Sequence, residues 1–247
     1  MSWLRRAARV LALTLLAAVL VSVLAVLALR FVPPLTTSFI LQARFDALST
    51  PAPELQFRRE WRALAAISPQ LQLAVVAAED QRFAEHQGFD FKQIHRALEE
   101  AGRGGRARGA STISQQVAKN LFLWGGHSWL RKGLEAWFTL LIELCWPKQR
   151  ILEMYLNIAQ FGPGIYGAEA AAQVFFHSPA RQLNREQAAR LAAVLPSPER
   201  MNAGRPGPYV LRRQRQIEAQ MSALGGTGWL ARLAPPAQNR PRAASVQ

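Results

Sequence analysis

The residues that could do chemistry begin with Glu79, the first residue of E-D-Q-R-F-A-E-H-Q-G, which follows an apolar run over residues 71–78. Ser68 and Pro69 before that run predict a helix N-cap followed by proline at the first helical position. A carboxylate on the last turn of such a helix is partly desolvated by the apolar face, and this raises its pKa toward the range of a general base. The alternative is an ordinary helix with a solvated, charged end, and this stretch alone does not exclude it.

A second glutamate, Glu135, lies among cations, because Arg131 and Lys132 precede it closely and Lys119 lies on the preceding predicted helix. Two carboxylates are typical of sugar chemistry through an oxocarbenium-like transition state. A hydrolase needs one of them protonated, whereas these cations would keep Glu135 ionised. Cations instead stabilise a pyrophosphate leaving group, so the pattern favours glycosyl transfer from a phosphate-linked donor. The alternative for Glu135 is an ordinary helix ion pair with Arg131, worth about 0.2–0.5 kcal/mol.

Helical patterns that would position these residues begin at Ser68 and continue to the last third of the chain. Asp90 with Gln93 predicts a capped helix whose apolar face holds Phe91, Ile94 and Leu98. Ser111 predicts the cap of a helix reaching about Leu123, with Gln115, Gln116 and Lys119 on a polar stripe. Further helices are predicted over residues 128–146, 148–157, 168–176 and 184–195, the last capped by Asn184 and Gln187, and a final helix carries Arg212, Arg213 and Arg215. No useful strand pattern and no internal repeat appears, so the expected fold class is all-α.

An N-terminal segment over residues 10–29 holds no charged residue, which is enough for about 30 Å of helix. Arg5, Arg6 and Arg9 precede it and Arg30 closes it. A secretory signal would be shorter and end in a small-residue cleavage site, of which residues 26–28 are a weak version. We therefore expect an uncleaved transmembrane anchor with a cytoplasmic N-terminus, and a cleaved signal is the alternative.

The composition allows one substantial domain, because the chain has 247 residues and 50% of them are hydrophobic. The net charge of +14 would ordinarily suggest nucleic acid or an anionic surface. On the outer side of a membrane the expected anions are lipid headgroups and lipid-linked phosphates, so no nucleic acid is expected. Cys145 is the only cysteine and lies in an apolar helical pattern. It therefore forms no intramolecular disulfide and is expected in the core.

Three segments carry weaker signals. Residues 30–66 are broken by four prolines, with an amphipathic turn expected over residues 39–45 near the membrane surface, and would let the domain swing on its anchor. Residues 102–109, G-R-G-G-R-A-R-G, predict a mobile basic loop that is no phosphate-binding P-loop. Residues 122–129 hold Phe122, Leu123, Trp124 and Trp129 around a Gly-Gly turn, and they predict either a core corner or a hydrophobic wedge in the bilayer interface.

Four stretches occur in an order that resembles a known enzyme family. E-D-Q-R-F-A-E-H-Q-G, G-A-S-T-I-S-Q-Q-V-A-K-N, R-K-G-L-E and K-Q-R-I-L-E-M-Y-L-N begin at residues 79, 109, 131 and 148. They resemble the successive signature motifs of glycosyltransferase family 51, the peptidoglycan polymerases, and R-L-A-A-V-L-P-S-P resembles the fifth. The resemblance covers about residues 64–208. Together with the anchor, it is closest to the monofunctional biosynthetic peptidoglycan transglycosylases.

The resemblance implies roles for particular residues. Glu79 matches the catalytic base and Glu135 the second essential glutamate. The substrate-binding positions implied are Asp80, Phe83 and His86 in the first motif, Ser111, Thr112, Gln116, Lys119 and Asn120 in the second, and Arg131 and Lys132 in the third. The first three also suit a purely structural role in the wall of the site. His127 stands where relatives usually have a donor-phosphate arginine, so neighbouring arginines or a protonated His127 would have to replace that contact.

The family implies an all-α, two-lobed, lysozyme-like domain with a small membrane-dipping jaw. The implied reaction polymerises lipid II into β-1,4-linked glycan strands, with inversion at the donor anomeric carbon and release of undecaprenyl pyrophosphate. The implied setting is a single-pass protein of the bacterial inner membrane with a periplasmic catalytic domain. Its partners would be lipid II, the growing glycan strand and other cell-wall synthesis and division proteins. No metal ligand is assigned, and a divalent cation, Mg²⁺ or Mn²⁺, at the pyrophosphate is left open.

Two other function classes compete with this one. A lytic enzyme would cleave the same polymer but does not need the stretch over residues 111–119, and a membrane-tethered basic binding module would not need Glu79. No transpeptidase activity is expected, because the sequence holds no S-x-x-K or K-T-G motif. The predicted divisions are a cytoplasmic tail over residues 1–9, an anchor over 10–29, a connection over 30–66, a glycosyltransferase domain over 67–223 and a flexible C-terminal tail over 224–247.

Overall fold

The computed structural model describes residues 2–49, 56–102, 111–126 and 128–234. The predictions for residues 103–109 of the basic loop, for His127 and for residues 235–247 therefore lie outside the described residues. In the described ranges the protein is mostly helical, as expected. Its α-helices are α1 (Ser2–Leu29), α2 (Ser38–Ser49), α3 (Pro69–Glu79), α4 (Phe91–Gly102), α5 (Ile113–Phe122), α6 (Trp129–Cys145), α7 (Lys148–Ile158), α8 (Ala168–Phe176), α9 (Arg185–Val194) and α10 (Pro208–Ala223).

Local capping chemistry begins several of these helices where the sequence indicates. Ser68 accepts a hydrogen bond from the Gln70 amide, with Pro69 at the first helical position of α3. Asn184 and Gln187 form a reciprocal capping box at α9. The predicted cap of α5 is wrong by one residue, because Thr112 and not Ser111 accepts from the Gln115 amide. Gln115 completes that capping box and is buried, so it is not part of the predicted polar stripe, which holds only Gln116 and Lys119.

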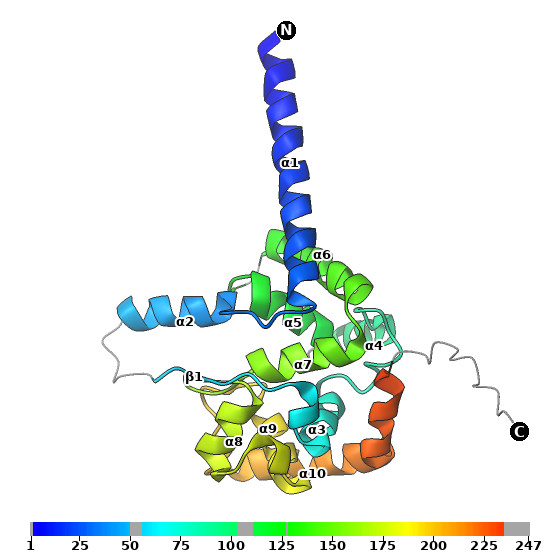
Figure 1. Cartoon of the computed structure of the whole chain (residues 1–247). Coiled ribbons are helices and arrows are strands. Elements are labelled where there is room, and N and C mark those ends of the chain that lie inside the picture. Colours follow the sequence, from blue (N-terminus) through cyan, green and yellow to red (C-terminus); the bar gives the residue numbers. More distant parts are fainter. Residues whose placement is uncertain (1, 50–55, 103–110, 127, 235–247) are drawn as a thin grey trace, which may run out of the picture.

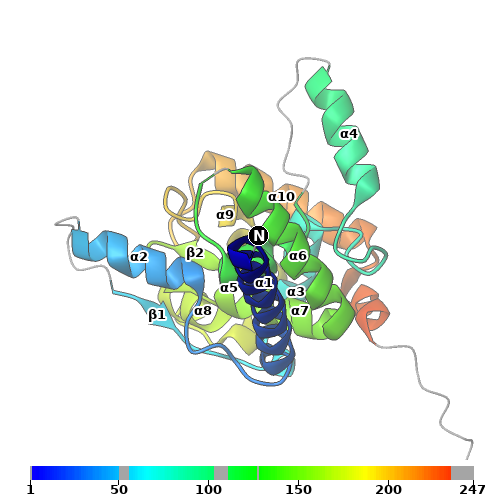
Figure 2. The same ribbon diagram turned by 90° about the horizontal axis from the view of Figure 1, so that it is seen from above.

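The hydrophobic core forms around α3, whose residues from Leu71 to Ala77 are buried. Helix α3 packs against α9 and α10, while α5 packs against α6 and α7. The chain after α3 therefore passes between these two groups of helices (Figure 1). Seen from above, α4 projects away from the rest of the domain (Figure 2). The core thus places the C-terminal end of α3, where Glu79 lies, next to α5.

A small sheet is a feature that the all-α expectation misses. It has the order β1-β3-β2, with β1 (Arg58–Arg59) parallel to β3 (Ile165–Tyr166) and β2 (Gln160–Gly162) antiparallel to β3. Strands of two or three residues are too short to show an alternating pattern in the sequence. The hairpin β2–β3 ends at Gly167, whose φ of +85° and close approach to the Asn157 carbonyl suit only glycine.

The anchor helix α1 rises from the domain (Figure 1) and, among the described residues, is the one helix long and apolar enough to cross a membrane. Its last two turns are docked on α6. The Trp146 indole donates to the Val26 carbonyl at 2.8 Å, and Val26 is fully buried. The Trp137 indole donates to the Ser22 hydroxyl at 3.1 Å. These contacts between α1 and the domain restrict the swing that the connection over residues 30–66 would otherwise allow.

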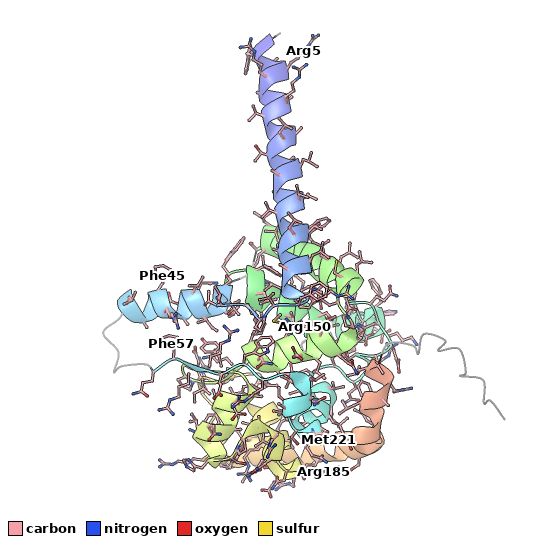
Figure 3. The ribbon with its side chains drawn as sticks, in the orientation of Figure 1. Arg5, Phe45, Phe57, Arg150, Arg185 and Met221 are labelled. Atoms are coloured by element: carbon pink, nitrogen blue, oxygen red, sulfur yellow. The ribbon has the colours of Figure 1, made fainter. Side chains whose placement is uncertain are left out.

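Two arginines close this junction from both sides. The Arg150 guanidinium donates to the Leu29 carbonyl at 2.8 Å and to the Val32 carbonyl at 3.1 Å, at the C-terminal end of α1. In return, the Arg30 guanidinium donates to the Cys145 carbonyl at the end of α6, at 2.7 Å. Carbonyls at a helix end have no partner within the helix, so a cation there is stabilising. Figure 3 shows Arg150 beneath the end of α1 and Arg5 at its far end.

Two further expectations need correction. The amphipathic turn expected over residues 39–45 is part of the twelve-residue helix α2, which follows the anchor. The flexible tail expected from residue 224 instead contains a 3₁₀ helix, Gly226–Leu233, with buried Trp229 and Leu233. These two apolar side chains, four residues apart, pack the segment onto the core. Two other short 3₁₀ turns, Leu64–Ala66 and Ala180–Gln182, lie elsewhere in the domain.

Candidate active site

Glu79 is the last residue of α3 and is partly buried beside α5. Burial raises the pKa of its carboxyl above the ordinary value, against the opposing effects of a hydrogen bond from Gln116 and of the charges of Arg213 and Lys119. The Gln116 amide nitrogen donates to Glu79 Oε2 at 2.7 Å. The expected direction of the pKa is therefore confirmed. A carboxyl group whose pKa is raised, and whose ionised form accepts a hydrogen bond from an amide, is suited to act as a general base.

Tyr155 on α7 contacts the other end of the Gln116 amide. The Tyr155 hydroxyl donates to Gln116 Oε1 at 3.1 Å, and the Gln116 nitrogen faces the Glu79 carboxylate. Burial, and then the charge of Glu79, raise the pKa of Tyr155 well above its usual value. The hydroxyl therefore keeps its proton and is available as the donor to Gln116, which supports this orientation of the amide.

Arg213 reaches the same helix end from α10. Its guanidinium donates to the Ala78 carbonyl at 3.1 Å, and its charge lowers the pKa of Glu79. The arginine thus ties α10 to the C-terminal end of α3 and favours the ionised carboxylate. Sequence reasoning placed Arg213 on the last helix but gave it no role, because nothing in the local pattern links residues 135 positions apart.

Asp80, Phe83 and His86 lie behind the candidate base and are buried. His86 Nδ1 accepts from the Gly88 amide at 3.2 Å, so Nε2 carries the proton that is shared with Asp80 at 2.9 Å. Asp80 Oδ2 also accepts from the Ile113 amide at the start of α5, at 3.0 Å. These bonds join the segment after α3 to the N-terminus of α5. The structure thus places the three residues in the wall of the site, and their predicted contact with substrate stays a prediction.

Glu135 is buried on α6 and holds two cations. Its Oε2 accepts from Arg131 at 2.8 Å, and its Oε1 accepts from Lys132. The expected ion pair with Arg131 is therefore present, and Lys132 pairs with the other carboxylate oxygen. Arg131 Nε is buried and has no hydrogen-bond partner among the described residues, which leaves one donor of a charged group to satisfy.

A cavity of about 480 Å³ opens next to Glu135 and its two cations. The predicted site residues that line it are Ser111, Lys119, Arg131, Lys132 and Glu135, together with Phe39, Trp124, Gly125 and Gly126. Lys119 Nζ lies 5.3 Å from the Phe39 ring centre, and burial lowers the pKa of this lysine while Glu135 opposes the shift. Three cations from two helices therefore meet in one cavity, which suits an anion.

The remaining predicted residues lie outside that cavity. Glu79 does not line the cavity. Helix α5 connects Glu79 to it, because Gln116, which contacts Glu79, and Lys119, which lines the cavity, are three residues apart on one face of that helix. Thr112 is buried, and its hydroxyl donates to the Gly88 carbonyl at 2.7 Å. Asn120, also on α5, is partly buried. The lining does not suit a protein-held divalent cation, since Glu135, its only acidic residue among those described, has both oxygens on cations.

Comparison of the sequence with known proteins identifies the family of this chain. The family model described as transglycosylase matches residues 48–222. A protein named biosynthetic peptidoglycan transglycosylase from Xanthomonas campestris pv. campestris (strain B100) is 56% identical over 209 residues, which are 85% of either chain. Proteins of the same name from Pseudomonas aeruginosa and Chromohalobacter salexigens are 54% and 50% identical, over 86% and 94% of this chain and 91% and 98% of theirs. Because a family model and these relatives span most of its length, the chain belongs to the transglycosylase family, as its motifs indicate.

Proposed function

We propose that this enzyme polymerises lipid II into β-1,4-linked glycan strands, with inversion at the donor anomeric carbon and release of undecaprenyl pyrophosphate. The observation that carries the proposal is the position of helix α5 between two kinds of site. Its Gln116 holds a carboxylate of raised pKa, and its Lys119 lines a cavity with two further cations. The names of the relatives, which are peptidoglycan transglycosylases, support the substrate class.

Glu79 is the general base in the proposed step. It removes the proton from the 4-hydroxyl of the acceptor sugar as that oxygen attacks the anomeric carbon of the donor, and the carbon–phosphate oxygen bond breaks on the opposite face. Gln116 and Arg213 keep part of the carboxyl population ionised although burial raises its pKa. The proton leaves on Glu79, and the electron pair leaves with the pyrophosphate.

The cavity lined by Lys119, Arg131 and Lys132 receives the pyrophosphate. Preorganised cations stabilise the charge that develops on the leaving group, so no proton donor is needed there. Glu135 holds Arg131 and Lys132 in place. A lytic enzyme would instead need a carboxylic acid free to protonate the leaving oxygen, whereas both oxygens of Glu135 already accept from cations.

The proposed setting is a bacterial inner membrane, with the N-terminus in the cytoplasm and the domain on the periplasmic side. Arg5, Arg6 and Arg9 precede the apolar part of α1, which favours this orientation. Retention of the anchor is supported by Val26 and Ser22, because both contact the domain and cleavage after residue 28 would remove them. We assign α2 and the turn after α5 to the small jaw that the family resemblance implies, beside the cavity they line.

The test is an assay of the full chain in bilayers with labelled lipid II. Wild-type protein should convert it to glycan polymer and should leave preformed strands intact. Glu79→Gln should lower turnover by at least three orders of magnitude while lipid II binding persists, since the amide keeps the shape but cannot accept the proton. Near-normal polymerisation by Glu79→Gln would sink the assignment of the base, and cleavage of preformed strands would replace polymerisation by lysis.

A further inference from the structure

A second cavity lies outside the site described above. It measures about 370 Å³ and is lined by the segment after the anchor, by α2 and by the small sheet. Ile40 and Arg44 of α2 line it, whereas Phe39 of the same helix lines the candidate active site. The two cavities therefore lie on different faces of α2. The family motifs between residues 79 and 157 contribute no residue to this second lining.

Cations dominate the polar part of this lining. Arg44, Arg58 and Arg59 line the cavity, and none of the described lining residues is acidic. Arg44 and Arg59 are close enough that the charge of Arg44 adds to burial in lowering the pKa of Arg59. None of the three forms an ion pair among the described residues, although Glu60 nearby does, with Arg62. Arg44 and Arg58 are exposed and Arg59 is partly buried, so this cluster of like charges attracts an anion from solution.

The donors of these arginines are only partly used. Arg59 is fixed in the fold, because its guanidinium donates to the Pro34 and Leu35 carbonyls at 2.7 and 3.1 Å. Arg58 donates to the Gln56 side chain, and Arg44 lies 5.6 Å from the Phe57 ring centre. A guanidinium has five N–H donors, so Arg44 and Arg58 keep donors in a fork geometry that matches two oxygens of a phosphate.

The position of the cavity along the chain indicates a lipid phosphate. Pro33, in the lining, is four residues from Leu29, the last residue of the anchor helix, and four residues reach at most about 14 Å. The headgroup layer outside the hydrocarbon is about 5–8 Å thick on each side. Next to the cavity, Leu35, Phe45 and Leu48 are strongly exposed apolar side chains. Figure 3 shows Phe45 on α2 and Phe57 beneath that helix.

We propose that this cavity binds the phosphate of an anionic phospholipid of the outer leaflet. Arg44 and Arg58 hold the phosphate, and the acyl chains lie along the exposed apolar residues of α2. Because α2 also carries Phe39 into the candidate active site, the bound lipid steadies one wall of that site. The proposal rests on the membrane setting proposed above but not on the polymerisation reaction.

The test measures lipid binding and not turnover, so its failure is distinct from a failure of the proposed reaction. Full-length protein in a nonionic detergent is titrated with dioctanoyl phosphatidylglycerol while its melting temperature is followed. Parallel titrations use dioctanoyl phosphatidylcholine, which carries no net charge, and inorganic phosphate. A ligand that binds only the folded state raises the melting temperature progressively as its free concentration exceeds its Kd. The expected result is such a rise with phosphatidylglycerol and a much smaller one with the other two compounds.

The matched variants are Arg44→Gln with Arg58→Gln, and as control Arg212→Gln with Arg215→Gln, which removes two exposed arginines from α10. The cavity pair should raise the apparent Kd for phosphatidylglycerol at least tenfold, because it loses two charge-assisted contacts, and the control pair by less than twofold. Equal losses in both pairs, no loss in either, or an equal rise with inorganic phosphate would each overturn the proposal.

Discussion

At the scale of single residues, the candidate base depends on a chain of three side chains from three helices. The Tyr155 hydroxyl donates to the Gln116 amide oxygen, and the amide nitrogen donates to Glu79. Burial alone would leave this carboxyl protonated over a wider pH range, and the hydrogen bond from Gln116 and the charges of Arg213 and Lys119 act against burial. Because these effects oppose one another, the Glu79 carboxylate is basic enough to accept a proton and is still ionised over part of the pH range in which the enzyme works.

Tyr155→Phe should therefore change the pH dependence of the reaction. Without the hydroxyl, Gln116 can turn its oxygen toward Glu79, and an acceptor there stabilises the protonated carboxyl. The pKa of Glu79, already raised by burial, rises further, so the acidic limb of kcat/KM moves to higher pH. The rate should fall several-fold on the acidic limb and little on the plateau at higher pH, and Tyr209→Phe, at an exposed position, should leave the profile unchanged. A Tyr155→Phe profile that overlays wild type would show that the amide is fixed by other contacts.

Lys119 gives a second test at this scale. Lys119→Ala should lower kcat by about 10²–10³, the usual effect of losing one preorganised group that stabilises transition-state charge. The lysine lies in the cavity with Arg131 and Lys132, and its burial keeps its charge from being screened. Lys92→Ala, which removes an exposed lysine from α4, is the control. If both variants kept the wild-type rate at equal melting temperature, the charge of Lys119 would have no role in the transfer reaction.

At the scale of elements, most helices were predictable and the contacts between them were not. Ser68, Asn184 and the apolar periodicities locate α3, α7, α8 and α9, because helix ends and faces are set by nearby residues. The strands of two or three residues, the docking of α1 on α6 and the burial of Trp229 depend on residues far apart in sequence. The same holds within the site. Glu79 and Glu135 were recognisable from their motifs, whereas Arg213 and the orienting role of Tyr155 were not.

The junction between α1 and the domain predicts a rigid anchor. Arg150→Ala removes the donors that reach the Leu29 and Val32 carbonyls and should loosen the last turn of α1. Spin labels at Val21 and Gln216, in a Cys145→Ser background, report the distance between anchor and domain by pulsed electron resonance. Wild type should give one narrow distance distribution and Arg150→Ala a clearly broader one. Arg200→Ala, at an exposed position, is the control. Equally narrow distributions in all three would show that the tryptophan contacts alone hold the anchor.

At the scale of the whole molecule, the docked anchor determines how deep the domain lies. The uncharged part of α1 ends at Leu29, and about twenty residues are needed to cross the hydrocarbon. Ser22 and Val26 lie within that stretch and contact α6. If the anchor spans the bilayer, the contacting end of α6 therefore lies at the level of the outer leaflet. The exposed apolar side chains of α6, among them Leu140 and Leu144, then face lipid and not water.

The aromatic turn divides into an inward and an outward part, so neither of the two expectations for residues 122–129 describes it fully. Leu123 is buried, and Phe122 stacks on Phe138 with ring centres 4.2 Å apart. Trp124 is 44% exposed and Trp129 is 93% exposed. The turn is also braced from α2, because the Gly125 amide donates to the Gln42 side chain at 2.9 Å. The inward residues hold the turn in shape, and the outward ones are free to contact a bilayer.

We therefore expect Trp129 and its neighbour Leu130 to lie in the outer leaflet, where they bring the cavity to the lipid-borne substrate. The hydrocarbon tail of that substrate cannot leave the bilayer cheaply, at about 0.8 kcal/mol per exposed CH₂, so the site must approach the membrane.

Full-length protein in nanodiscs, with Cys145→Ser and a spin label at Leu130, should show higher accessibility to oxygen than to a water-soluble nickel chelate. A label at Tyr209, on α10, should show the reverse. Trp129→Ser should leave the melting temperature unchanged, whereas Leu123→Ser should lower it by several degrees, because a buried leucine contributes about 1.5–3 kcal/mol. A Leu130 label as accessible to nickel as the Tyr209 label would place the turn in water.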